Sequence, residues 1–262
     1  MIKYLKIYKL FFKNSLALLA SHRFNLLMSA IANIVWTFGQ IVSLQFLFTR
    51  IDSFEGWSIN DMVLLLGFGQ LFVYIMFVLY FNNHGELQTK ILEGELDTLL
   101  LKPVSTQFFI SFQNVLIAQI IPLFIAVAPL IVIGIRDLRA LSVHDVLFSI
   151  IVLLIGMIVM YLLSLSLSGL NFFTDNATAI RDMVMNTTDM SRIPLTFFPN
   201  PIQLVFVFFI PLAFVTYYPT LILKSPQNMF LILGLEIFTL IVFYFISQFI
   251  WKKGLQRYSG VA

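Results

Sequence analysis

Six apolar runs, each long enough to cross a lipid bilayer, constrain what this 262-residue chain can fold into. A membrane-spanning helix needs about 20 mainly apolar residues. The runs are Phe24–Phe48, Met62–Phe81, Phe108–Ile135, Val146–Phe173, Pro201–Leu223 and Met229–Trp251. They are continuous and lack the alternation of a membrane β-barrel strand. The pattern therefore predicts an all-α polytopic membrane protein, with six transmembrane helices in a single domain over residues 1–262.

The balance of charged and apolar residues supports this prediction. Hydrophobic residues make up 60% of the chain and charged residues 11%, whereas a soluble domain carries about 25% charged residues. So little charge cannot cover a soluble core, and so much apolar sequence does not stay disordered. These values exclude a soluble globular enzyme. The chain also has no cysteine, which excludes disulfides and thiolate metal sites.

The distribution of lysine and arginine predicts the orientation. Six spans place both termini on one side, and cytoplasmic loops carry the excess of these cations. With the N-terminus inside, the inner segments hold 12 of them and the outer segments hold 4. Arg181 and Arg192 count as inner, in a polar segment from Thr174 to Asn200, and Arg139 counts as outer. The sequence thus predicts a multi-pass protein of the plasma membrane with both termini cytoplasmic.

Residues 1–23 are predicted to form an amphipathic interfacial helix. At about 100° per residue, Tyr4, Tyr8 and Phe11 lie on one face of a helix, and the four lysines of the segment lie opposite. An aromatic face suits the headgroup region, and a cationic face suits anionic lipid. A plain basic flank is one alternative. A cleavable signal peptide ending near Ala20 is another, although the interspersed lysines and the short apolar stretch argue against it.

The segment between the second and third spans has the clearest pattern outside the spans. Residues 84–101 place branched apolar residues on one side and charged residues on the other. The apolar side is Leu87, Ile91, Leu92, Leu96, Leu99 and Leu100, and the polar side includes Glu86, Lys90, Glu93 and Asp97. We predict a short amphipathic helix on the cytoplasmic face, interrupted at Gly94 and ended by Pro103. Such a helix could rest on the membrane, but its acidity favours a protein partner over anionic lipid.

Catalytic and cofactor motifs are missing from the sequence. No G-x-x-x-x-G-K-[ST] loop is present, so the chain cannot hold ATP by that route. The three histidines form no pair with metal-ligand spacing, and no set of Ser, His and Asp indicates a nucleophile. The sequence therefore predicts no enzyme activity, no metal site and no cofactor in this chain. Nothing in it indicates a nucleic-acid partner.

Polar residues inside the apolar runs are the remaining candidates, because the bilayer makes them costly. Glu236 is the one acidic residue inside a run, and Gln40 and Gln70 lie in the first and second runs. Each is a candidate for a translocation path. The structural alternative is a hydrogen bond to a neighbouring helix.

The fifth run carries two prolines and two tyrosines near its outer end. Pro211 and Pro219 predict bends. Tyr217 and Tyr218 suit the outer membrane interface. These four residues are either an aromatic belt or a bent outer end that opens and closes as a gate.

These features together resemble a known family. Six spans, a basic interfacial helix and the stretch Gly-Glu-Leu-Asp-Thr-Leu-Leu-Leu-Lys-Pro from Gly94 to Pro103 are similar to type-2 ATP-binding-cassette exporter permeases. The pattern Pro-x-Ala-Phe-x-x-Tyr-Tyr-Pro, from Pro211 to Pro219, is similar to that of a bacterial branch of these permeases. The resemblance covers essentially the whole chain. Many members have short outer helices between the last two spans, which implies that the end of the fifth run forms them here.

The resemblance implies a subunit of an ATP-driven exporter in a bacterial plasma membrane. Residues 84–101 would be the coupling helix that docks on a separate ATPase subunit, and ATP and Mg²⁺ would bind to that partner. Two permease chains, identical or related, would work with two ATPase chains in the lipid bilayer. ATP-driven closure of the ATPase pair would move the permeases by alternating access and carry a hydrophobic or amphipathic substrate.

Three other functions remain open from the sequence. An ion- or proton-coupled secondary transporter would use Glu236 as its coupling carboxyl, although no internal repeat supports that plan. A membrane enzyme acting on lipid would need clustered His, Asp or Glu side chains at one interface. A scaffold of a membrane complex would need no site at all.

Overall fold

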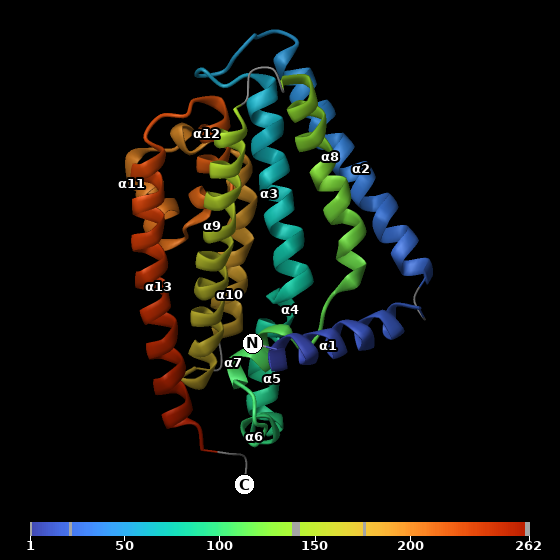
Figure 1. Ribbon diagram of the computed structural model, residues 1–262, viewed down its shortest axis with the longest axis vertical. Coiled ribbons are helices and arrows are strands. Elements are labelled where there is room, and N and C mark those ends of the chain that lie inside the picture. Colours follow the sequence, from blue (N-terminus) through green and yellow to red (C-terminus); the bar gives the residue numbers. More distant parts are fainter. Residues whose placement is uncertain (1, 21–22, 138–141, 175–176, 260–262) are drawn as a thin grey trace.

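The computed structural model describes residues 2–20, 23–137, 142–174 and 177–259, and these form an all-helical structure. Its long helices are α1 (Ile2–Ala20), α2 (Arg23–Phe48), α3 (Ile59–Leu79), α8 (Ile120–Asp137), α9 (Val143–Gly169) and α13 (Met229–Arg257). Figure 1 shows α3, α9 and α13 along the long axis, α2 leaning away from them, and α1 lying crosswise at the lower ends of α8 and α2. Four parts of the predictions lie outside the described residues: residues 1 and 21–22 of the interfacial helix, Arg139, residues 175–176 of the polar segment, and the last three residues.

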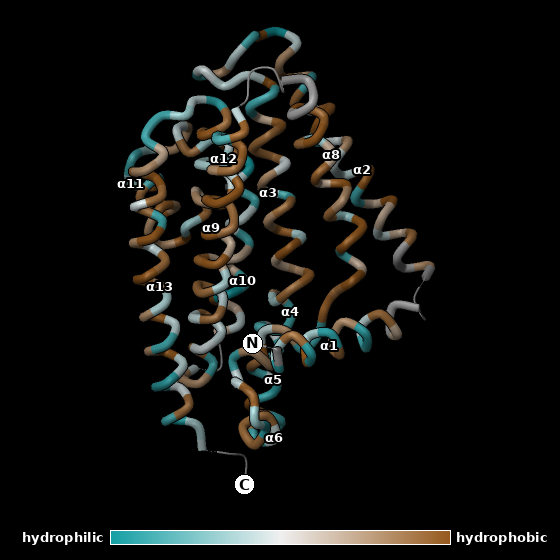
Figure 2. The backbone as a smooth tube through the Cα atoms, in the orientation of Figure 1, coloured by the Kyte–Doolittle hydropathy of each residue, from teal (hydrophilic) through white to brown (hydrophobic). Residues whose placement is uncertain are grey.

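Four helices are long and apolar enough to cross a membrane. These are Leu27–Phe48, Ile59–Leu79, Val143–Phe172 and Met229–Arg257. They coincide with the first, second, fourth and sixth apolar runs, and their apolar surface is plain in Figure 2. Two further helix pairs pass the same test only when each sharply bent pair is taken together, so the described residues offer 4 to 6 candidate spans. The prediction of an all-α, multi-pass membrane protein is confirmed at this level.

Helix α9 lies at the centre of the packing, with α13 along one side of it and α10 and α12 against it. A Cβ at Gly156 would lie 2.8 Å from the backbone oxygen of Phe214. Glycine at this position therefore allows the short helix η6 (Leu212–Phe214) to sit directly on α9. In contrast, only 6% of the apolar window of α2 is buried inside the chain. Helix α2 is thus available to a neighbour outside the chain.

The predicted third span is broken rather than continuous. Its parts are α7 (Thr106–Phe112), η1 (Ile117–Gln119) and α8, and the two halves meet at 55°. Backbone groups at the break have no helical partner and must bond elsewhere. Their partners are the side chain of Asn83, the hydroxyl of Ser15 on α1 and the backbone oxygen of Val78 on α3.

The polar segment Thr174–Asn200 is mostly helical and packs along α3 and α9. It contains α10 (Ala177–Asn186), η3 (Thr187–Arg192) and η4 (Leu195–Phe197). Arg181 donates a 2.8 Å hydrogen bond to the backbone oxygen of Phe81, just beyond one end of α3. Phe197 packs at 4.9 Å on Phe54, in the loop before the other end of α3. The segment therefore runs along the whole length of α3, because it buries one face of its helices against α3 and α9.

The fifth apolar run forms a sharply bent pair of helical segments rather than one continuous helix. Residues 200–224 form α11 (Asn200–Leu204), η5 (Val205–Phe209), η6 and α12 (Tyr217–Lys224). The halves of this bent pair meet at 80°, next to Pro211, as the proline predicted. The segment before α11 packs on the loop that precedes α3, and Lys224 lies 3.3 Å from Asp61 at the start of α3. The bent pair thus enters and leaves at the same end of the molecule, the upper end of Figure 1.

The predicted coupling helix is divided into three short helices. They are α4 (Phe81–Gly85), α5 (Leu87–Leu92) and α6 (Glu95–Leu100). Gly94 separates the last two with a φ of 74°, which a residue with a Cβ adopts only at a cost. The predicted interruption at Gly94 is confirmed.

The aromatic face of α1 contacts protein. Tyr4 packs edge-on against Phe108 at 4.8 Å, and Phe11 packs against Phe109 at 5.0 Å, both on α7. The interfacial helix was expected to turn this face toward lipid headgroups. Instead the helix uses much of it to hold the broken third span, while its lysines stay exposed.

Candidate functional site

The coupling segment has a buried side formed by its regularly spaced leucines. Leu87 and Leu96 are fully buried and Leu99 nearly so. They share a cluster with Phe172 and Trp251 from the ends of α9 and α13. The structure therefore places these three predicted coupling residues in the chain's own core, where they anchor the segment.

The opposite side of the coupling segment is exposed, apolar and acidic. Leu92 is 60% exposed and Leu101 is 86% exposed. Glu93 and Glu95 are exposed beside them, on either side of the turn at Gly94. A tip that combines bare leucines with carboxylates suits a protein surface that is both apolar and basic.

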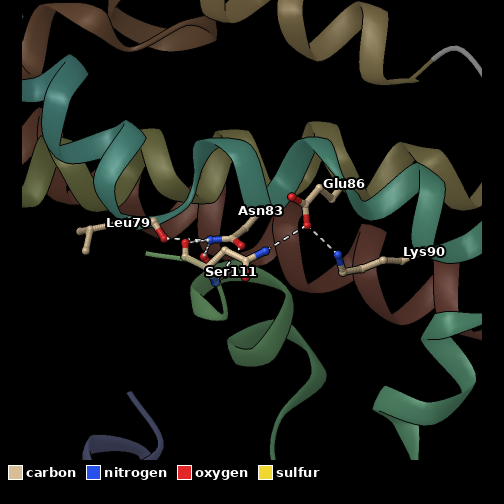
Figure 3. A network of polar contacts seen from close by, with 6 residues as sticks. Leu79, Asn83, Glu86, Lys90 and Ser111 are labelled. Carbon is tan, nitrogen blue, oxygen red and sulfur yellow. Dashed lines mark hydrogen bonds and ion pairs between the residues drawn. The ribbon is translucent and has the colours of Figure 1, made fainter. Parts of the chain in front are cut away.

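Asn83 ties the coupling segment to the broken third span (Figure 3). Its side-chain amide donates to the backbone oxygens of Ser111, at 3.0 Å, and Asn114, at 2.7 Å. Its oxygen accepts from the backbone N–H of Asn114 at 3.1 Å. Close by, the Glu86 carboxylate lies 2.7 Å from the Lys90 ammonium and 3.3 Å from the side-chain amide of Asn114. The Asn83 side chain thus bonds three backbone groups at the break.

His84 connects three helices in a buried network. One ring nitrogen lies 2.8 Å from the hydroxyl of Ser164 on α9, and the other lies 3.0 Å from the hydroxyl of Ser111 on α7. Ser111 also contacts the hydroxyl of Tyr161 at 2.9 Å. Burial, and secondarily the charge of Arg181, lowers the pKa of His84 from 6.5 to about 3. His84 is therefore neutral at physiological pH, with one ring nitrogen donating and the other accepting.

Arg181 joins α10 to the start of the coupling segment. Its side chain is nearly fully buried, pairs with Asp182 and donates to the backbone oxygen of Phe81. The guanidinium carbon also lies 4.5 Å from the centre of the Phe81 ring. A Cβ at Gly85 would lie 2.7 Å from the guanidinium. The sequence pattern gave no sign of this contact, since Arg181 was counted only as a loop cation.

Gln40 and Gln70, both predicted for a translocation path, are brought together between α2 and α3. Their side-chain amides lie 2.5 Å apart, and the Thr37 hydroxyl lies 3.1 Å from the Gln70 amide. When the side-chain oxygen of Gln40 faces Arg192 and Trp36, it accepts hydrogen bonds from Arg192 at 2.7 Å and from Trp36 at 3.0 Å. This polar network links α2, α3 and η3.

Arg192 lies near the middle of α3, although the sequence assigned it to a cytoplasmic loop. A Cβ at Gly69, halfway along α3, would lie 3.9 Å from its side chain. Asp189 pairs with it at 2.9 Å, and the Asp189 side chain is 73% exposed. The only sequence signal for this position was the length of the polar segment, which is enough to run the length of a span.

A groove of 960 Å³ opens beside this polar network. Its wall is mostly apolar side chains of α2, with Leu66 from α3. Trp36, Gln40, Ser43 and Arg192 supply its polar positions. The groove therefore contains one of the two predicted path glutamines and one cation that the sequence did not place there.

The four predicted gate residues all belong to the bent pair. Tyr217 packs at 5.7 Å on Trp57 in the loop between α2 and α3, which the sequence predicts to be an outer loop. The Lys224 ammonium lies 4.3 Å from the centre of the same ring. The hydroxyl of Ser149 on α9 donates to the backbone oxygen of Pro219 at 2.9 Å. The pair is thus held between the loop before α3 and α9.

Glu236 is fully buried on α13, against α9. The backbone of Gly156 lies close to its carboxyl group. Within the described residues, however, no group makes a hydrogen bond of standard geometry to either oxygen. Glu236 is not part of the groove that Gln40 lines, so the structure separates it from the other path candidates.

Metal ligands do not gather in the part of the chain that the structure describes. No group of three His, Asp or Glu side chains there has an arrangement that could hold a metal ion. The buried histidine is instead engaged by two serine hydroxyls. The polar groups described above bind one another, and their chemistry is that of recognition and positioning.

The comparisons with known proteins identify one family. A sequence profile described as "ABC-2 family transporter protein" matches residues 34–262. The match includes most of α2 and everything that follows, and so contains the coupling segment, the bent pair and every groove-lining residue except Ala32. No curated protein and no solved structure shows a match.

Proposed function

The chain belongs to the ABC-2 transporter family, and from this we propose that it is the permease subunit of an ATP-driven exporter. Membrane proteins of this family generally work with ATPase subunits. The proposal places the chain in a bacterial plasma membrane with both termini cytoplasmic. It carries a hydrophobic or amphipathic substrate by alternating access, and ATP and Mg²⁺ bind to the partner.

The path of the chain supports six crossings, with a different fifth crossing from the predicted one. In this proposal α2, α3, α7–α8, α9, α10–η4 and α13 cross the membrane, and the bent pair dips in from the outer side and returns. The 10 residues of α10 and the 6 of η3 rise by about 27 Å at about 1.5 and 2.0 Å per residue. The hydrocarbon core is about 30 Å thick. The polar segment is therefore long enough to cross.

The observation that carries the proposal is the exposed charge at the middle of this fifth crossing. Asp189 is 73% exposed at the depth of the centre of α3. A charged side chain at the bilayer centre costs about 2.5–3.5 kcal/mol on insertion scales. A second permease chain, the same or a related one, would shield this face and enclose a water-lined path along α2 and η3.

The exposed tip around Gly94 is the proposed contact with the ATPase. Its leucines and carboxylates point away from the chain's own core, and the buried leucines behind them fix its position. Asn83, His84 and Arg181 connect the tip to α7, α9 and α10. Movement of two ATPase subunits would reach the membrane helices through these contacts.

The test compares exposed and buried leucines of the same segment. The chain is purified with its partner ATPase, and ATP turnover and assembly are measured in nanodiscs. Combined Leu92→Ala and Leu101→Ala should abolish assembly or coupled turnover without lowering unfolding stability. Leu96→Ala should instead destabilise the permease itself by about 2–5 kcal/mol, as large-to-small core substitutions do. Intact assembly and coupled turnover in the double variant would rule out this docking surface.

A secondary transporter is the second candidate, because the carboxyl of Glu236 is buried without a standard hydrogen bond. It requires transport in vesicles that lack any ATPase, and loss of that transport in Glu236→Gln. The exporter proposal requires the reverse, namely transport only with the ATPase and ATP. The position of Glu236 outside the groove favours the exporter.

A further inference from the structure

The groove beside α2 combines an apolar wall with a single cation. Its 960 Å³ lies within the range of about 300–1,000 Å³ found for small-molecule sites. Trp36 is 58% exposed and Phe46 is 79% exposed along it. Arg192 is the charged residue among those that line it. The wall suits an apolar chain, and the guanidinium suits an anion.

Arg192 has hydrogen-bonding capacity left for a ligand. A guanidinium carries five N–H donors. Among the described residues, Asp189 accepts at 2.9 Å and Gln40 accepts at 2.7 Å when its oxygen faces the guanidinium. Asp189 does not line the groove, so it balances the charge without filling the site. The remaining donors are available to a group that enters from the groove.

We propose that this groove binds a single-chain anionic amphiphile, with its head on Arg192 and its apolar chain along α2. The inference rests on the proposed export function, since the amphiphile would be the transported substrate. A carboxylate or phosphate accepts charge-assisted hydrogen bonds from a guanidinium. These bonds are stronger than hydrogen bonds between neutral groups, so Arg192 favours an anionic head. The volume of the groove is that of a small-molecule site, which favours one chain over a two-chain lipid.

Trp36 allows binding to be measured without any transport assay. It lines the groove, whereas Trp57 and Trp251 are 3% and 6% exposed. The full chain in phosphatidylcholine nanodiscs is titrated at alkaline pH with brominated stearate, which quenches tryptophan on contact. Brominated methyl stearate is the neutral control, and Trp36→Phe gives the background. We expect half-maximal quenching at an about tenfold lower mole fraction for the anion, the effect of one charge-assisted hydrogen bond.

Substitutions then test the role of the guanidinium. Arg192→Gln should remove the preference for the anion, and Gln40→Glu, which places a carboxylate beside the guanidinium, should do the same if the first variant does not fold. Lys253→Gln removes an exposed cation near the end of α13 and should keep the preference. Equal quenching by anion and ester, an unchanged preference in both groove variants, or no saturable quenching would each overturn the proposal. Competition by phosphatidylglycerol as strong as that by unbrominated stearate would show a membrane lipid in the groove, which also overturns it. Failure of ATP-driven transport alone would leave these binding results standing, so the two proposals fail separately.

Discussion

Replacing His84 with asparagine should change how the stability of the protein depends on pH. In the folded protein both ring nitrogens are occupied by serine hydroxyls, and burial lowers the pKa of His84 to about 3. In the unfolded chain the pKa returns to about 6.5. Above pH 6.5 the side chain is neutral in both states and adds no pH dependence.

Below that value the two states differ in the protons that they bind. Between pH 6.5 and about 3 the unfolded chain is protonated at His84 and the folded chain is not. As the pH is lowered through this range, the free energy of unfolding therefore falls by about 1.4 kcal/mol for each pH unit. From pH 7.5 to pH 5 the contribution of His84 alone is a loss of about 2 kcal/mol. Asparagine does not titrate, so this slope should vanish in His84→Asn.

The assay is reversible unfolding in mixed micelles at several pH values between 5 and 7.5. His84→Asn loses a buried hydrogen bond, which lowers stability by about 1–3 kcal/mol at every pH. The difference in unfolding free energy between the original protein and His84→Asn should then be about 2 kcal/mol smaller at pH 5 than at pH 7.5. His144→Asn is the control for the substitution itself, because the His144 side chain is 69% exposed and its replacement should change the unfolding free energy by no more than about 0.5 kcal/mol. Parallel curves for the original protein and His84→Asn would refute the reasoning.

Three further substitutions test the backbone and the outer end. Gly94→Ala should cost about 1–2 kcal/mol because the φ of 74° is left-handed, and the loss should be seen in thermal unfolding of the permease. Gly156→Leu should displace η6 and lower the unfolding temperature, since even a Cβ there lies 2.8 Å from the Phe214 oxygen. Lys224→Met should free the outer loop from α12, because its ammonium sits 4.3 Å from the Trp57 ring centre. Faster protease cleavage of that loop from outside intact cells is the expected readout.

The long apolar helices were predictable because length and hydropathy suffice for them. Helices α2, α3, α9 and α13 coincide with apolar runs of the sequence. Most residues of these elements are apolar and face either apolar protein or the outside of the bundle, so the average over a window decides the outcome. No knowledge of their neighbours was needed.

The position of residues 177–198 along α3 could not be predicted, because it depends on partners for their charged side chains. Arg181 is buried, yet it has Asp182 and the backbone oxygen of Phe81 as partners. Arg192 has Asp189 and Gln40. A hydropathy average treats each charged residue as if it were unpaired. In the folded chain, pairing lowers the free energy of burying these residues. The partners come from distant parts of the sequence, so a local pattern cannot reveal them.

The coupling segment shows a second limit of pattern reasoning. The spacing of Leu87, Leu96 and Leu99 correctly indicated a helix with an apolar side. The same spacing serves a helix that anchors in its own bundle and one that docks on a partner. The structure buries all three and exposes Leu92 and Leu101 instead. Which side faces outward depends on Phe172 and Trp251, at the ends of two distant helices.

The polar segment also connects the groove with the coupling segment. Arg192 lines the groove at one end of η3, and Arg181 packs on Phe81 and Gly85 at the other end of the same helical run. A shift of the coupling segment would have to move α10 with it or leave the buried guanidinium of Arg181 without its backbone acceptor. Leaving a buried charge without its partner is strongly unfavourable. Movement of the coupling segment and rearrangement around Arg192 are therefore expected to occur together. The contacts of Arg181 that link them can be removed one at a time by substitution.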